Sequence, residues 1–319
     1  MNRITIAFSS HRPETLAYTA SMMDRHDTIF LEEPPAPGFS DMLKERLAVD
    51  TYVMESGTEY PEYGMRLCRL LQKQFREGKT VAQVEPFLEI LLEIHEHFAN
   101  GGRPEEIAER SPFRAVYAAE KLATGRLINF YDIAMDGSFA DVLKAVKSFA
   151  RADAARFRLR DTMRAVAIAG GLPRAGRIFI EAGDMHQTLP SELRQRLPAG
   201  SRVKIEYLME PVVRPLTGKR QLLGPGDILT LHYLFRPEAE SAKLEILAAR
   251  SLIYSKIIAK EELPDKDGNF PHINNEWACI RQVRRLSMGD CAKLYPHIRR
   301  VGTLHAADIV KQFLKKRVL

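Results

Sequence analysis

Histidine and glutamate residues follow three apolar, strand-like runs of this sequence. ITIAF precedes His11, TIFL precedes Glu32 and Glu33, and RIFI precedes Glu181 and His186. In open α/β sheets, functional sites gather at the carboxyl ends of strands, so we expect these side chains at one edge of a sheet. Imidazole and carboxylate groups bind divalent metal ions, and they also act as general acids and bases.

The residue types indicate which side chains would bind a metal and which would accept a proton. His11, Glu32 and His186 supply nitrogen and oxygen ligands suited to Mn or Zn and leave one position for water. Glu32 and Glu33 are neighbours in an extended segment, so their side chains point to opposite faces, and we favour Glu32 as the ligand. Glu33 and Glu181 then remain as candidates to take the proton of the water. A simpler interpretation of His186 is a local hydrogen bond or helix cap.

A helical segment upstream of His186, RFRLRDTMRAVAIAG, adds positive charge. Arg156, Arg160 and Arg164 are spaced four residues apart and therefore share one helical face, with Asp161 beside them. Arg160 is our candidate for holding an anionic substrate group or a developing oxyanion. The alternative is a solvated basic face paired with nearby acids.

These motifs together resemble a superfamily that contains Tiki proteases, TraB-like proteins, ChaN-like haem-uptake proteins and erythromycin esterases. The motifs are FSSH at 8–11, FLEEP at 30–34, RDTM at 160–163 and EAGDMH at 181–186. The resemblance covers mainly residues 1–35 and 155–210, and Phe8 stands where the family pattern has glycine. Tiki-like members imply metal-dependent proteolysis, erythromycin esterases imply ester hydrolysis, and ChaN-like members imply haem binding.

Three functional hypotheses follow. The first is a metal-dependent hydrolase of an ester, amide or peptide bond, acting on a small-molecule or peptide substrate through the His/Glu site. The second is a non-catalytic protein that binds haem or another anionic ligand in the same pocket. The third is an interaction protein that uses its basic C-terminal segments, such as IRQVRR at 280–285. No groove-reading or RNA-binding motif accompanies those charges, so we expect a solvated basic surface and no nucleic acid partner.

The order of strand, helix and strand at the start of the chain predicts an α/β fold with a mainly parallel open sheet. Strands are expected at residues 4–8, 28–31, 177–180 and 203–208, and a helix is favoured at 227–235. Apolar residues at three- and four-residue spacing predict a helical insertion from about 59 to 170. Within it, Glu85, Glu89, Glu93 and His97 form a stripe that could bind a metal in a helical bundle, but no second Glu-x-x-His helix accompanies it, so we favour a solvated stripe. We therefore expect an α/β core over residues 1–236 and a helical extension over 237–319.

Composition limits the remaining possibilities. The net charge of +6 and the pI near 9.1 tolerate anionic ligands. Three widely spaced cysteines without a CxxC pair argue against a disulfide framework and against a zinc knuckle. No secretory leader is visible, and no apolar run approaches the roughly 20 residues of a membrane-spanning helix. The sequence thus predicts a cytoplasmic protein.

Overall fold

The computed structural model describes residues 1–58, 60–108, 111–264 and 269–316. The chain divides into two compact units, one made of residues 1–117 and 158–221 and the other of residues 118–157 and 222–319. Two of the three divisions fall inside the long helices α7 (Phe113–Asp136) and α8 (Phe139–Gly170), so both helices contribute to both units, and the third division follows residue 221.

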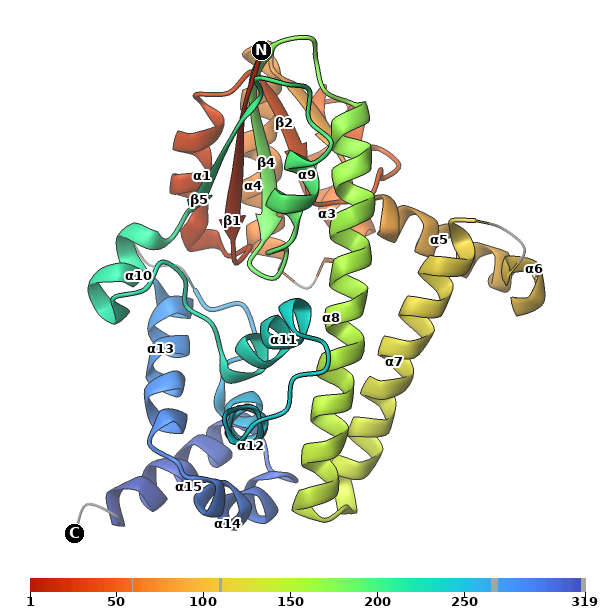
Figure 1. Cartoon of the computed structure of the whole chain (residues 1–319). Helices are drawn as coiled ribbons and strands as arrows, with labels where there is room; N and C mark the ends of the chain where they lie inside the picture. The colour runs from red at the N-terminus through yellow and green to blue at the C-terminus, as the bar shows by residue number, and fades with distance from the viewer. Residues whose placement is uncertain (59, 109–110, 265–268, 317–319) are drawn as a thin grey trace. The chain divides into compact units, whose positions relative to one another are not determined.

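A five-stranded parallel sheet forms the centre of the first unit (Figure 1). Its strands are β1 (Asn2–Ser9), β2 (Thr28–Leu31), β3 (Thr80–Gln83), β4 (Gly176–Gly183) and β5 (Arg202–Tyr207). They lie in the order β3-β2-β4-β1-β5, and every neighbouring pair is parallel. All five carboxyl ends therefore meet at one edge of the sheet, and the predicted α/β fold with a parallel sheet is confirmed.

Helices cover both faces of this sheet. One face carries α1 (Leu16–Met23), which follows a 3-10 turn (Pro13–Thr15), α2 (Phe39–Leu43), α3 (Val49–Ser56) and α4 (Pro61–Arg76), and the other carries α9 (Leu189–Arg194) and the end of α8. The first unit also contains α5 (Pro86–Ala99), α6 (Pro104–Ala108) and α10 (Glu210–Thr217). Side chains alternate between the faces along each strand. Ile6 and Ile180 pack with Ala165 of α8 and Leu193 of α9, whereas Phe179 packs on the side of α1 to α4.

The predicted strands appear within a few residues of their expected bounds. The segment from about 59 to 170, predicted as a helical insertion, is mostly helical but also contains a strand. Glu59 lies outside the described residues, and α4 begins at Pro61. Residues Thr80–Gln83 form β3, which pairs with β2. This strand is short and only partly buried. Its neighbours in sequence are strongly helical, so helical periodicity on both sides hid the strand.

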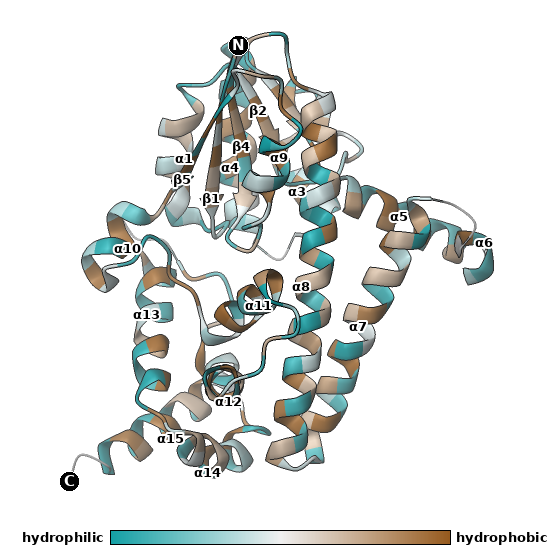
Figure 2. Ribbon diagram, viewed as in Figure 1, coloured by the Kyte–Doolittle hydropathy of each residue, from teal (hydrophilic) through white to brown (hydrophobic). Residues whose placement is uncertain are grey.

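In the second unit, all the regular secondary structure of the described residues is helical. Besides parts of α7 and α8 this unit contains α11 (Pro225–Phe235), α12 (Ala242–Ile257), α13 (Pro271–Arg284), α14 (Met288–Ile298) and α15 (Thr303–Lys316). Its core gathers apolar side chains from each of these helices, among them Val142, Leu252, Val283, Leu294 and Val310. Figure 2 shows the apolar positions as brown bands interrupted by hydrophilic teal ones. The predicted helix at 227–235 is confirmed as α11, which belongs to this second unit rather than to the first.

The described helices include none with the length and apolar character required to cross a bilayer.

Candidate active site at the strand ends

Glu32, directly after β2, is the centre of a cluster of charged side chains at the carboxyl edge of the sheet. Its Oε1 lies 2.7 Å from Nε2 of His186, and its Oε2 accepts a hydrogen bond from the backbone N–H of Gly183. Burial alone would raise the pKa of Glu32, but the charges of His186 and Arg164 hold it well below its usual range. Glu32 is therefore a buried carboxylate that stays ionised.

Asp161 of α8 holds the other side of the His186 ring. Its Oδ1 contacts Nδ1 of His186, and its Oδ2 accepts hydrogen bonds from the backbone N–H and the hydroxyl of Thr188. Burial lowers the pKa of His186, but Glu32 and Asp161 outweigh this and raise it to about 9. The ring thus has a fixed orientation, with Nε2 directed at Glu32.

Two arginines one turn apart on α8 complete the cluster. Arg164, fully buried, donates to the carbonyl oxygens of Val84 and Glu181 at 2.9 and 2.6 Å, and its Nη1 lies 3.4 Å from Glu32. Arg160 lies one turn away, with Nη2 3.6 Å from Glu32 and Nε 3.5 Å from Glu85. Of the predicted arginine face, Arg160 and Arg164 are therefore largely buried and lie close to carboxylates. Arg156 instead pairs with Glu120 and Asp153 in the second unit.

Glu85 is the functional candidate that sequence reasoning placed wrongly. It was expected in a solvated stripe, but it precedes α5 and is fully buried, whereas Glu89 and Glu93 are exposed. Its Oε1 is within hydrogen-bonding distance of Arg160, while its Oε2 accepts no hydrogen bond and lies 4.0 Å from Nε of Arg164. Glu32 was identified because it follows a predicted strand. Glu85 likewise follows β3, but β3 was not predicted from the sequence, so the same signal was missed.

Glu32, Glu85 and His186 each offer one ligand atom, and these atoms lie within 4.8 Å of one another. Two of the three residues were expected as ligands from the sequence. The third expected ligand, His11, lies beside the group: a Cβ on Gly183 would be 3.4 Å from Oε2 of Glu32 and 3.5 Å from Cε1 of His11. His11 adopts a left-handed backbone (φ 49°), which is uncommon for a residue other than glycine and concentrates at functional sites.

Glu181 carries a second set of contacts on the α4 side of the sheet. Its Oε1 accepts a hydrogen bond from the hydroxyl of Tyr63 at 3.1 Å and lies 3.6 Å from Nε2 of His11. Its Oε2 accepts from the backbone N–H of Glu32 at 3.3 Å. Burial and the charge of Glu181 raise the pKa of Tyr63 well above its ordinary value, so the phenol remains a donor. His11, with 32% of its side chain exposed, is the most accessible of these groups.

Glu33 points away from Glu32, as expected for adjacent residues in an extended segment. Its Oε2 accepts a hydrogen bond from Nε2 of Gln83 at 2.8 Å. Burial and the nearby Glu181 raise its pKa. The predicted residues His11, Glu32, Glu181, His186 and Arg160 therefore come together, and Glu33 lies at the rim of that group.

Comparison with known proteins identifies one relative over nearly the whole chain. The chain is 31% identical over 291 residues to an uncharacterized protein of Archaeoglobus fulgidus, which covers 91% of this chain and 97% of that one. The chain belongs to the family of this archaeal protein. No protein-family model matches it, and no solved structure matches it.

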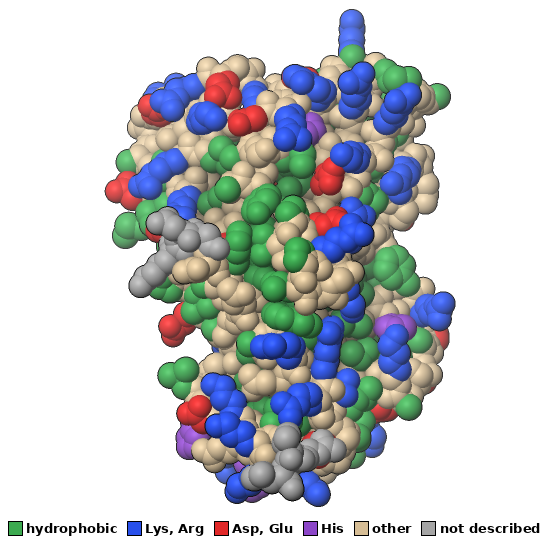
Figure 3. All heavy atoms as spheres, turned by 90° about the vertical axis from the view of Figure 1, so that its left-hand side faces the viewer, with side chains coloured by type: hydrophobic (Ala, Val, Ile, Leu, Met, Phe, Trp, Pro, Cys, Tyr) green, Lys and Arg blue, Asp and Glu red, His purple; other side chains and the backbone are tan. Residues whose placement is uncertain are grey.

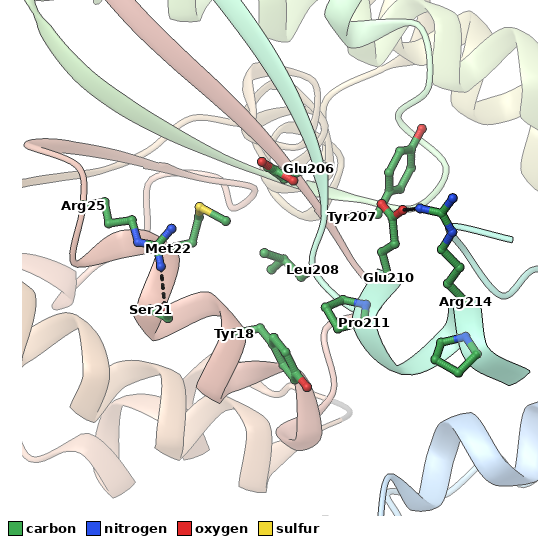
Figure 4. A pocket seen from close by; sticks show the side chains of 11 residues that line it. Tyr18, Ser21, Met22, Arg25, Glu206, Tyr207, Leu208, Glu210, Pro211 and Arg214 are labelled. Atoms are coloured by element: carbon green, nitrogen blue, oxygen red, sulfur yellow. Dashed lines mark hydrogen bonds and ion pairs between the residues drawn. The ribbon is translucent and has the colours of Figure 1, made fainter. Parts of the chain in front are cut away.

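The first unit of the present chain also has a cavity of about 670 Å³ away from the charged cluster (Figure 4). The cavity lies between α1 and the end of β5 with α10. Its walls include Tyr18, Met22 and Leu208, and the pair formed by Glu210 and Arg214 at 3.1 Å lines it as well. None of its lining residues belongs to the cluster around Glu32, so the cavity contributes no group to that chemistry.

Proposed function

We propose that this protein is a metal-dependent hydrolase of an ester, amide or peptide bond, with a divalent metal held by Glu32, Glu85 and His186. The convergence of these three ligand atoms within 4.8 Å carries the proposal. Asp161 behind His186 supports it, because histidines that bind metals usually donate their second ring N–H to a carboxylate, which fixes the ring.

The charges around the three residues fit a cation. Binding of a metal would displace the proton of His186, and the carboxylates of Glu32, Glu85, Asp161 and Glu181 then outnumber the guanidiniums of Arg160 and Arg164, which leaves a negative excess suited to a divalent ion. The Oε2 atom of Glu85 is buried without a hydrogen bond, and a buried polar atom of this kind needs a partner. A Mn or Zn ion there would lower the pKa of a bound water and polarise the substrate carbonyl.

The remaining side chains have separate tasks in this proposal. Glu181 would accept the proton of the attacking water at Oε1, which lies 3.6 Å from Nε2 of His11, while Tyr63 donates a hydrogen bond to the same oxygen. Arg160, the more accessible arginine, binds the anionic end of a substrate or the oxyanion that forms during attack. Arg164 makes no such contact, because its donors are already directed at the ends of three neighbouring strands.

Metal content tests the proposal directly. Protein stripped with a chelator and refilled with Mn or Zn is expected to retain about one ion per chain after desalting and to gain hydrolytic activity on a panel of esters, amides and peptides. Glu85→Gln should lose the ion, whereas Glu89→Gln, one turn later on the exposed side of α5, should keep it. Equal metal content in both variants, or none in the parent protein, would overturn the assignment.

Arg160→Gln separates binding of the metal from catalysis. We expect this variant to keep its metal while hydrolysis falls about 10²–10³-fold, the usual effect of removing one group that stabilises an oxyanion.

The haem-binding hypothesis stays a prediction, which haemin titration checks: a Soret shift that depends on His11 or His186 would support it in place of hydrolysis.

A further inference from the structure

The positive charge of the chain is concentrated in its last three described helices. Residues 269–316 contain nine Lys and Arg residues and three Asp and Glu residues, an excess of six that equals the net charge of the whole chain. The rest of the sequence holds 38 basic and 38 acidic residues and is balanced. A charge asymmetry of this kind indicates a surface for polyanions.

The outer side of α13 combines this charge with the single tryptophan of the chain. Trp277, Arg281 and Arg284 are spaced four and three residues apart and therefore share one helical face. The guanidinium carbons of Arg281 and Arg284 lie 5.9 and 5.4 Å from the centre of the Trp277 ring. Both arginines are exposed and the indole is partly exposed, so the aromatic ring lies at the surface beside two cations.

Helix α15, which packs beside α13, extends the positive surface. Lys311 and Lys315 are exposed and one turn apart. Of the three acidic residues of this region, Asp290 is buried and caps α14 through Ser287, which leaves Glu276 and Asp308 against nine basic residues. Figure 3 shows the side of the protein that faces left in Figure 1, and in its lower part Lys and Arg side chains gather with few acidic ones. We call Trp277, Arg281, Arg284, Lys311 and Lys315 the basic face.

The sequence alone predicted a solvated basic surface without a nucleic acid partner, but the exposed tryptophan beside two arginines changes that expectation. We propose that the basic face binds single-stranded nucleic acid, with lysines and arginines along the phosphates and a base stacked on Trp277. Bases of a duplex are already stacked, whereas those of a single strand are free to stack on an aromatic ring, which contributes about 1–3 kcal/mol per base. This function is separate from the proposed hydrolase, because no residue of the basic face belongs to the cluster around Glu32.

Trp277 serves as the reporter of its own binding. Titration of the full chain with oligouridylate should quench tryptophan fluorescence as the base stacks, and a fluorescein-labelled oligomer should gain anisotropy over the same range. Because four basic side chains would contact phosphates, log K should fall with log salt concentration with a slope of about −3. The variant Arg281→Glu/Arg284→Glu should bind at least about tenfold more weakly and show a smaller slope.

A control with the same change of charge separates the basic face from general electrostatics. Lys44→Glu/Lys219→Glu reverses two exposed lysines of the first unit and should change affinity less than about twofold. Lys311→Glu/Lys315→Glu repeats the main test on a second helix in case the first variant folds poorly. Equal losses in the control, anisotropy without quenching, or binding only to phosphatidylserine vesicles or to polyglutamate would overturn the proposal.

Discussion

At the scale of single residues, Arg164 connects the ends of three strands. It is fully buried, donates to the carbonyl oxygens that follow β3 and lie in β4, and pairs with Glu32 after β2. Removing one partner of a buried ion pair leaves a charge without compensation, which costs about 3–5 kcal/mol. We expect Arg164→Met to lower the free energy of unfolding by this amount, measured by urea denaturation followed by circular dichroism.

Arg46→Met provides the matched control, because Arg46 pairs with Asp41 at the surface and both side chains are more than half exposed. Surface pairs contribute at most about 1 kcal/mol. Arg164→Lys should recover only part of the loss, since an ammonium group lacks the fork geometry that reaches three partners. If Arg164→Met and Arg46→Met are equally stable, Arg164 does not hold the strand ends together.

At the scale of elements, His26 joins the end of α1 to β1. Its Nδ1 lies 2.7 Å from the carbonyl oxygen of Met22 and therefore donates, and its Nε2 lies 2.9 Å from the hydroxyl of Thr5. The ring edge packs on Phe179 of β4. Burial lowers the pKa of His26, although the hydrogen bond to Met22 opposes this. The neutral ring is thus the form that fits between helix and sheet.

This lowered pKa has a defined consequence for stability. The unfolded chain takes up a proton at His26 near pH 6.5, and the folded chain does so only at a lower pH. The free energy of unfolding contributed by His26 is therefore complete above pH 6.5 and is lost as the pH falls through the folded pKa. In urea titrations between pH 7.5 and 5, His26→Gln should lose stability less steeply than the parent protein; parallel curves would contradict this.

The elements also show which parts of the fold are readable from sequence. β2 was predicted at its observed bounds because TIFL is wholly buried, and wholly buried strands are continuously apolar. β3 was missed because it is only partly buried and so lacks a continuous apolar run. The burial of Glu85, which follows β3, was missed for the same reason. The insertion of β4 between β2 and β1 depends on pairing across about 150 residues, which no local pattern encodes. The convergence of His186 with Glu32 follows from that insertion.

At the scale of the whole molecule, each of the two compact units has apolar cores of its own, one on each face of the sheet in the first unit and one among the helices of the second. The first unit contains Phe179, which is fully buried in the middle of the sheet, and the second contains Leu252 of α12 among the C-terminal helices. Each core belongs to one of the two compact units, and the chain passes from one unit to the other near residues 117, 158 and 221. Compact units with their own cores often open as separate cooperative units.

Cavity-forming substitutions in each unit test this independence. Phe179→Ala should cost about 3–5 kcal/mol and Leu252→Ala about 2–5 kcal/mol, because each removes a buried side chain that its surroundings only partly replace. Native-state hydrogen exchange should show Phe179→Ala reducing protection in β1, β2 and β4, with α12 and α14 little affected, and Leu252→Ala should give the reverse pattern. Equal losses of protection throughout the chain in both variants would show instead that the two units unfold in one cooperative step.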